Sequence, residues 1–134
     1  MPMSSRVTAI AAADPATASE HFESCLRFET DCSDVHDALE GGAPDFVLLD
    51  VRSAELYARG HVRGAINLPH RAITADTLRA HPADALLVVY CAGPHCNGAH
   101  RAALRIAKLG RRVKLMIGGV TGWLDEGYEL ARGA

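Results

Sequence analysis

Hydrophobic residues concentrate in two uninterrupted runs near the middle of the chain. Residues 86–90 are entirely apolar, and residues 46–51 are broken only by Asp50. A continuous run, rather than one that alternates with polar residues, is typical of a strand covered on both faces. These two segments are therefore predicted to be central strands. Shorter strands are expected at 26–30, at the edge of a sheet, and at 65–67 and 113–116.

Helical spacing of apolar residues appears between these runs. Asp14 followed by Pro15 indicates an N-cap and a first helical position, so a helix is predicted over about residues 15–26. Ser33 or Asp34 can cap a second helix, which ends at the glycine pair 41–42. Further helices are expected at 53–59, 74–80, 99–109 and 120–126.

The alternation of strands and helices predicts an α/β fold with a parallel sheet, right-handed crossovers and helices on both faces. A functional site then lies beyond the carboxyl ends of the strands. The 134 residues suit one domain. We expect a leader and helix over residues 1–26 and a single domain over residues 27–134.

Charge and cysteine content narrow the class of protein. The chain carries 14 Lys and Arg against 16 Asp and Glu, with no run of like charges, so nucleic acid and membranes are not expected partners. Residues 1–13 are too weakly hydrophobic for a signal peptide or membrane span. A domain of this size needs no disulfides, so four free thiols and a cytoplasmic location are expected.

The strongest chemical signal is Cys91, which directly follows the strand predicted at 86–90. A turn containing glycine and proline leads from it into a helix, a geometry in which backbone N–H groups converge and favour an anion. We therefore expect a lowered pKa and a nucleophilic thiolate. A buried, inert cysteine is the alternative, but it does not explain the residues of the loop. These are Ala92, Gly93, Pro94, His95, Cys96, Asn97 and Gly98.

Three segments carry a family resemblance. They are LLDVR at 48–52 with Glu55 and Tyr57, GHVRGAINLP at 60–69, and GGVTGWLDEGY at 118–128. In this order, with Cys91 between the second and third, they resemble the rhodanese homology domain over about residues 30–130. The resemblance implies a three-layer fold whose central sheet has five parallel strands.

The resemblance also implies an activity. Cys91 would take a sulfane sulfur from a donor such as thiosulfate, hold it as a persulfide, and pass it to cyanide or to a thiol. No metal or organic cofactor is implied. The partners would be a small sulfur-containing anion and a protein or low-molecular-weight thiol. Asp50 and Arg52 would anchor the loop, and Arg101 beside it would help attract the anion.

The loop departs from the family pattern. It is about two residues longer than usual, and Cys96 and Asn97 stand where a basic residue is common. Asn97 also takes the place of the arginine that phosphatases of related fold require, so phosphatase activity is disfavoured. Zinc binding by Cys91, His95, Cys96 and His100 is disfavoured because their spacing lacks a Cys-x-x-Cys pair.

Cys96 leaves several roles open. It could resolve a persulfide or sulfenic acid on Cys91, it could itself be the nucleophile with Arg101 five residues on, or it could be a bystander. The protein as a whole could be a sulfurtransferase, a relay module fed by a partner protein, or a redox protein that uses the two loop cysteines. The sequence leaves the oligomeric state open between monomer and homodimer.

Overall fold

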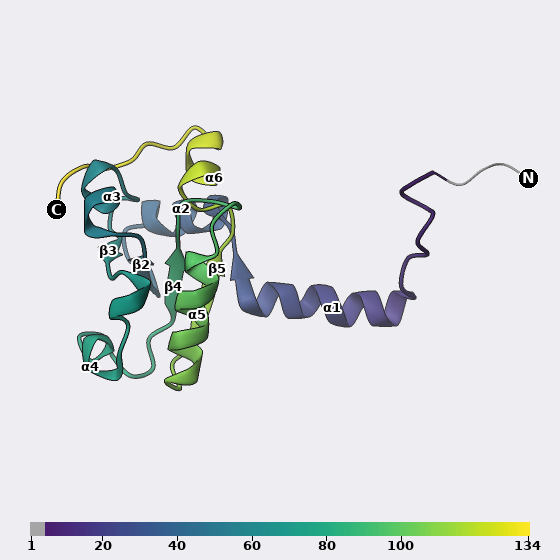
Figure 1. Ribbon diagram of the computed structural model, residues 1–134, viewed down its shortest axis with the longest axis horizontal. Helices are drawn as coiled ribbons and strands as arrows, with labels where there is room; N and C mark the ends of the chain where they lie inside the picture. The colour runs from purple at the N-terminus through teal and green to yellow at the C-terminus, as the bar shows by residue number, and fades with distance from the viewer. Residues whose placement is uncertain (1–4) are drawn as a thin grey trace, which may run out of the picture.

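The computed structural model describes residues 5–134 and confirms the α/β fold (Figure 1). Five parallel strands form one sheet in the order β1-β5-β4-β2-β3. Parallel strands need crossovers, which the helices supply. The elements are α1 (Pro15–Phe28), β1 (Glu29–Thr30), α2 (Cys32–Glu40), β2 (Val47–Asp50), α3 (Ala54–Arg59), β3 (Ile66–Asn67), the 3-10 helix η1 (His70–Ala72), α4 (Ala75–Leu78), β4 (Leu87–Tyr90), α5 (Gly98–Lys108), β5 (Val113–Met116) and α6 (Gly119–Asp125).

Alternation along the strands separates two cores. Leu49, Leu87 and Val89 face a core with residues of α4 and α5 and with Ile73, which follows η1. Leu48 and Val88 face the opposite core with residues of α2 and α6. Because β2 and β4 lie between these layers, they are buried on both sides, as their apolar runs predict. The helices therefore cover both faces of the sheet.

The ends of several elements differ from the prediction, and the clearest differences lie at the start of the domain. Asp14 caps α1 as expected, and its carboxylate accepts a hydrogen bond from the Thr17 amide at 3.0 Å. The helix then continues to Phe28, which shortens the edge strand predicted at 26–30 to Glu29–Thr30. The cap of α2 is Asp31, not Ser33 or Asp34, because its carboxylate accepts the amide hydrogen of Asp34 at 2.8 Å.

Two helices, η1 and α1, have features that the sequence did not predict. The 3-10 helix η1 was not predicted, because three residues are too few to show a helical period. Helix α1 buries none of its residues and projects away from the sheet (Figure 1). Within residues 5–134 no helix is long and apolar enough to cross a bilayer.

Candidate active site

The loop between β4 and α5 lies at the carboxyl end of the sheet. Cys91 is the first residue after β4, and only 5% of its surface is exposed. Its side chain belongs to the core beneath α5, together with Ala99 and Ala102. The loop continues to Asn97, and Gly98 begins α5. The buried strand and the helix thus hold both ends of the loop in place.

The start of α6 supports this loop from the side. The amide of Val120 donates to the Cys91 carbonyl at 3.1 Å, and the amide of Thr121 donates to the Ala92 carbonyl at 2.9 Å. Gly119 makes this close approach possible. A Cβ atom there would lie 2.8 Å from the Gly93 nitrogen and closer still to the Cys91 carbonyl oxygen. Only glycine fits, and it also has φ +57°.

These α6 residues were not predicted as part of the site. The glycine pair at 118–119 was noted as part of a resemblance, but its contact with a loop 27 residues earlier depends on the tertiary fold. Thr121 adds a hydroxyl hydrogen bond of 3.1 Å to the Ala92 carbonyl. The carbonyl oxygens of Cys91 and Ala92 therefore both accept hydrogen bonds from α6.

The loop folds back so that its two cysteines meet. A turn closed by the Cys96 amide on the Gly93 carbonyl, at 3.0 Å, reverses the chain. The Cys91 thiol then donates to the Cys96 carbonyl at 3.4 Å. The Gly98 amide donates to the Cys96 sulfur at 3.4 Å. Both thiols are free, and each is close enough to affect the pKa of the other.

The pKa values of the two thiols move in opposite directions. Burial raises the pKa of Cys91; the amides of Ala99 and Gly93 offset part of this, and the neighbouring Cys96 raises it further. The Gly98 amide lowers the pKa of Cys96 against the smaller effect of its burial. The lowered pKa expected at Cys91 is therefore wrong: the amides converge on both sulfurs, and the more exposed Cys96 is the better stabilised thiolate.

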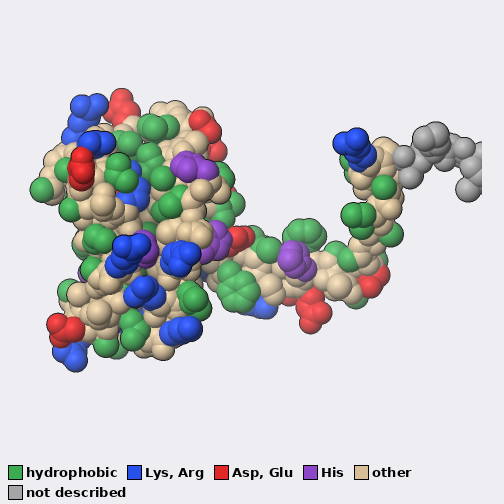
Figure 2. All heavy atoms as spheres, viewed as in Figure 1, with side chains coloured by type: hydrophobic (Ala, Val, Ile, Leu, Met, Phe, Trp, Pro, Cys, Tyr) green, Lys and Arg blue, Asp and Glu red, His purple; other side chains and the backbone are tan. Residues whose placement is uncertain are grey.

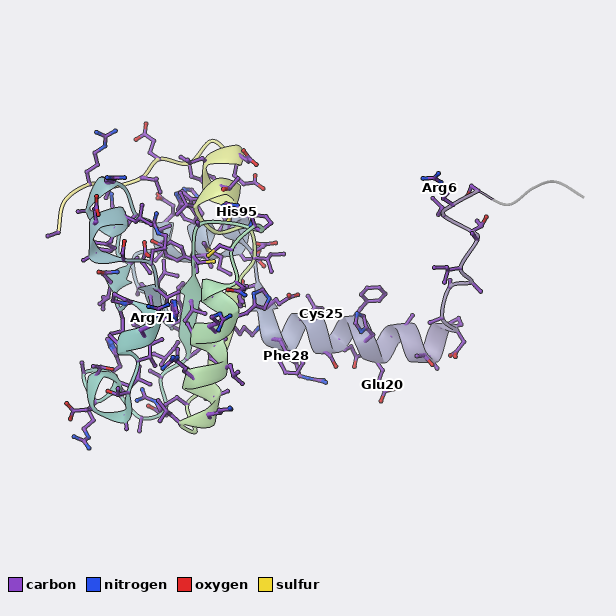
Figure 3. The ribbon with its side chains drawn as sticks, viewed as in Figure 1. Arg6, Glu20, Cys25, Phe28, Arg71 and His95 are labelled. Carbon is purple, nitrogen blue, oxygen red and sulfur yellow. The ribbon has the colours of Figure 1, made fainter. Side chains whose placement is uncertain are left out.

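A basic groove of about 900 Å³ opens beside the two cysteines. Its basic side chains come from three segments, which are the turn after β2, η1 and α5, and no Asp or Glu among residues 5–134 lines it. Figure 2 shows Lys and Arg side chains gathered over α5, and Figure 3 labels Arg71, which comes from η1. The basic residues that line the groove are Arg52, Arg71, Arg101, Arg105 and Lys108.

Other predicted loop residues lie at the surface. Pro94, His95 and Asn97 are exposed, and Figure 3 shows His95 at the outer end of the loop, near α6. The Asn97 side-chain oxygen accepts a hydrogen bond from the Arg101 guanidinium at 3.2 Å. Arg101 therefore lies beside the loop, and it also lines the groove. Within residues 5–134 no cluster of three metal-binding side chains is present.

Asp50 and Arg52 form a buried ion pair, but its contacts are not with the cysteine loop. An Arg52 Nη atom lies 2.7 Å from an Asp50 carboxylate oxygen. The same nitrogen donates to the Gly60 carbonyl at 2.6 Å, and Asn67 donates to the carbonyls of Asp50 and Arg52. The pair therefore ties β2 to the end of α3. Direct anchoring of the cysteine loop is not observed, although Arg52 also lines the groove.

His70 is a groove residue that sequence reasoning missed. It lies in η1 and lines the groove with Cys91 and Cys96, and its buried Nδ1 has no hydrogen-bond partner among the described residues. Burial, and then the positive charge of Arg71, lower the pKa of its imidazole. A neutral ring is therefore favoured at neutral pH. In the sequence, His70 directly follows the segment at 60–69, and no motif there marks it as a site residue.

These observations define an α/β protein with a two-cysteine loop at the carboxyl end of a parallel sheet. The sequence model of the rhodanese-like domain matches residues 31–126, most of the chain. The chain belongs to the rhodanese-like domain family, and the resemblance seen in the sequence is confirmed. This membership places it in the sulfurtransferase superfamily without defining its reaction.

Curated relatives share the domain but are longer. The chain is 40% identical over 93 residues to the HTH-type transcriptional regulator Rv0324 of Mycobacterium tuberculosis, covering 69% of this chain and 40% of that protein. It is 32% identical over 93 residues to the uncharacterized protein YibN of Escherichia coli K12, covering 66% of this chain and 63% of that protein. The chain thus spans less than two thirds of either relative.

Solved structures agree on the fold. The BH2092 protein of Bacillus halodurans superposes with a TM-score of 0.85 at 37% identity, covering 89% of this chain and 87% of that chain. A thiosulfate sulfurtransferase of Pseudomonas aeruginosa superposes with a TM-score of 0.65 at 20% identity, covering 87% of this chain and 21% of that chain. The second likeness concerns the fold alone.

Proposed function

We propose that this protein is a sulfurtransferase that carries a sulfane sulfur as a persulfide on Cys91. The observation that carries the proposal is the position of Cys91. Its thiol lies at the end of β4, with the Ala99 and Gly93 amides directed at it and a basic groove beside it. Amides that stabilise a thiolate also stabilise the anionic persulfide that replaces it.

The groove supports an anionic sulfur donor. Thiosulfate carries two negative charges, and the groove presents five basic side chains without an acidic one. Arg101 and Arg71 lie on different elements, α5 and η1, so together they can contact one anion from two sides. In the transfer, the Cys91 thiolate attacks the sulfane sulfur, the sulfur–sulfur bond of thiosulfate breaks, and sulfite leaves with the electron pair.

Cys96 supports the formation of the Cys91 thiolate. Because the pKa of Cys91 is raised and that of Cys96 is lowered, Cys96 loses its proton before Cys91 does. The Cys96 thiolate can accept the proton of Cys91 as the donor binds. A serine at position 96 would slow this step without abolishing it, since water can also take the proton.

The experiment follows sulfur on the protein by intact mass. In the Cys96→Ser variant, Cys91 is the one loop thiol, and incubation with thiosulfate is expected to add one sulfur atom that cyanide removes as thiocyanate. The Cys91→Ser variant is expected to gain none. Cys25→Ser, altered on the exposed helix α1, should form thiocyanate from thiosulfate and cyanide at the wild-type rate.

Three outcomes count against the proposal. Sulfur gained by Cys91→Ser but not by Cys96→Ser would make Cys96 the carrier. If the protein gains sulfur from a low-molecular-weight persulfide but not from thiosulfate, it is a sulfur-relay module and not an enzyme that acts on thiosulfate. No gain in either variant from either donor would refute sulfur transfer through this loop.

A further inference from the structure

The two loop cysteines form a pair that a one-cysteine sulfur transfer does not need. The turn from Gly93 to Cys96 brings the second cysteine back to the first, and a Cβ atom on Gly98 would lie 3.4 Å from the Cys96 sulfur and 3.5 Å from the Cys91 Cβ. Both side chains therefore converge on the first residue of α5. Cys96 also borders the basic groove and a second cavity of about 580 Å³.

The other cysteines lack these properties. Cys25 lies on α1, outside both cavities. Cys32 lines the second cavity, but its sulfur donates to the Ile117 and Gly119 carbonyls, and burial raises its pKa to about 11. A thiol held in this way is a poor nucleophile at neutral pH. Cys96 is thus the cysteine placed to react with a group on Cys91.

We propose a second activity for the same loop: Cys96 resolves the Cys91 persulfide, releasing hydrosulfide and leaving a Cys91–Cys96 disulfide. This inference rests on the proposed function, because the persulfide must form first. The protein would then reduce sulfane sulfur to sulfide at the expense of a thiol reductant, in addition to transferring it.

The step balances without an external oxidant. The Cys96 sulfur attacks the inner sulfur of the persulfide, a new bond joins the two cysteine sulfurs, and the inner–outer sulfur bond breaks. The outer sulfur leaves with the electron pair and takes the Cys96 proton, so hydrosulfide is formed. The sulfane sulfur is reduced by two electrons and the two cysteines are oxidised. A dithiol then returns the loop to two thiols by disulfide exchange.

The geometry favours attack on the inner sulfur. That sulfur is Cys91 Sγ, which donates to the Cys96 carbonyl at 3.4 Å, so it lies against the Cys96 residue itself. The Gly98 amide, which donates to the Cys96 sulfur at 3.4 Å, lowers the pKa of Cys96 and so helps its thiol give up the proton that the outer sulfur takes. An external thiol reaches the outer sulfur instead, through the groove. The two routes therefore compete for one persulfide.

The experiment is a single turnover with one equivalent of thiosulfate and no added thiol or cyanide. Sulfite, sulfide, the intact mass and the number of alkylatable thiols are measured. Wild type and Cys25→Ser are expected to release one sulfite and one sulfide per chain, to lose two thiols, and to show a Cys91–Cys96 disulfide by peptide mapping. Cys96→Ser is expected to release sulfite, retain the added sulfur and release no sulfide.

The failures of the two proposals are distinguishable. If wild type releases sulfite and keeps a stable persulfide, with no sulfide and no disulfide, resolution by Cys96 is refuted while the sulfurtransferase stands. If neither wild type nor Cys96→Ser releases sulfite, the proposed function itself fails. Equal sulfide release from Cys96→Ser and wild type would assign the release to another group and overturn the inference. The far-ultraviolet circular dichroism of each variant verifies that it is folded.

Discussion

Replacing Gly119 with alanine tests whether α6 positions the cysteine loop. The new Cβ would lie 2.8 Å from the Gly93 nitrogen, closer to the Cys91 carbonyl oxygen, and 3.0 Å from the Ala92 carbonyl carbon. All three neighbours are backbone atoms, so no side chain can rotate away. Restoring an ordinary contact of ~3.5 Å to the Cys91 carbonyl oxygen, the closest of the three, needs a shift of roughly 1 Å in the loop.

The magnitude combines two effects. A φ of +57° costs an alanine about 1–2 kcal/mol, and overpacking adds about 1–3 kcal/mol. Gly127→Ala provides the control for the first effect, because Gly127 has φ +85° and a Cβ there would meet nothing within 4 Å. Gly119→Ala should therefore lower the free energy of unfolding more than Gly127→Ala does. A misplacement near 1 Å can also cost about 10²-fold in rate.

Two measurements decide the outcome. Urea unfolding compares the free energies of the two alanine variants, and the thiocyanate assay compares their rates at a temperature where both are folded. We expect a rate loss of about 10²-fold for Gly119→Ala and a near-normal rate for Gly127→Ala. Equal stability and equal rates for the two variants would refute the assignment of Gly119 as the contact that holds the loop.

Three further perturbations test the site and the fold. Asp50→Ala leaves a buried guanidinium without its partner and should lower the free energy of unfolding by about 3–5 kcal/mol in urea, whereas Glu55→Ala, in an exposed pair, should change it by less than ~1 kcal/mol. When the rate of alkylation is followed against pH, Cys96 should react with a lower midpoint than Cys91, because the pKa of Cys96 is lowered and that of Cys91 is raised. Cys96→Ala should move the Cys91 midpoint down because a neighbouring negative charge is removed, and equal midpoints for the two thiols would contradict the assignment. Arg101→Ala should raise the KM for thiosulfate by up to about fivefold, which is the size expected for one exposed charge. The substitution should also weaken the dependence of KM on salt concentration. An unchanged KM at low salt would show that Arg101 takes no part in binding the donor.

Much of the fold was predictable because its signals are local. The apolar runs at 46–51 and 86–90 indicated strands buried on both faces, and β2 and β4 lie between the two cores. Asp14 and Pro15 marked the start of α1. The cap of α2 was harder to place, because Asp31, Ser33 and Asp34 all lie near its start and all are residue types that cap helices, and only the backbone conformation selects Asp31.

The candidate site, like the fold, was predictable from the sequence only in part. Position along the chain was enough to place Cys91 at a strand end and the loop residues around it, and to predict Arg101 near the opening. It was not enough to assign the pKa values, because these depend on how deeply each sulfur is buried and on where the surrounding amides are directed. The prediction of a lowered pKa at Cys91 failed for this reason, and Cys96 is the thiol that the Gly98 amide favours.

The amino-acid sequence alone was enough to predict the α/β class, the order of strands and helices, the family and the position of the cysteine loop. Each of these depends on periodicity, capping or motif, which are written along the chain. Three contacts became known only from the packed chain: Gly119 supports the loop, the Asp50–Arg52 pair braces α3, and Cys96 lies against Cys91. Such contacts join distant segments or depend on how a turn folds, and packing alone brings them together.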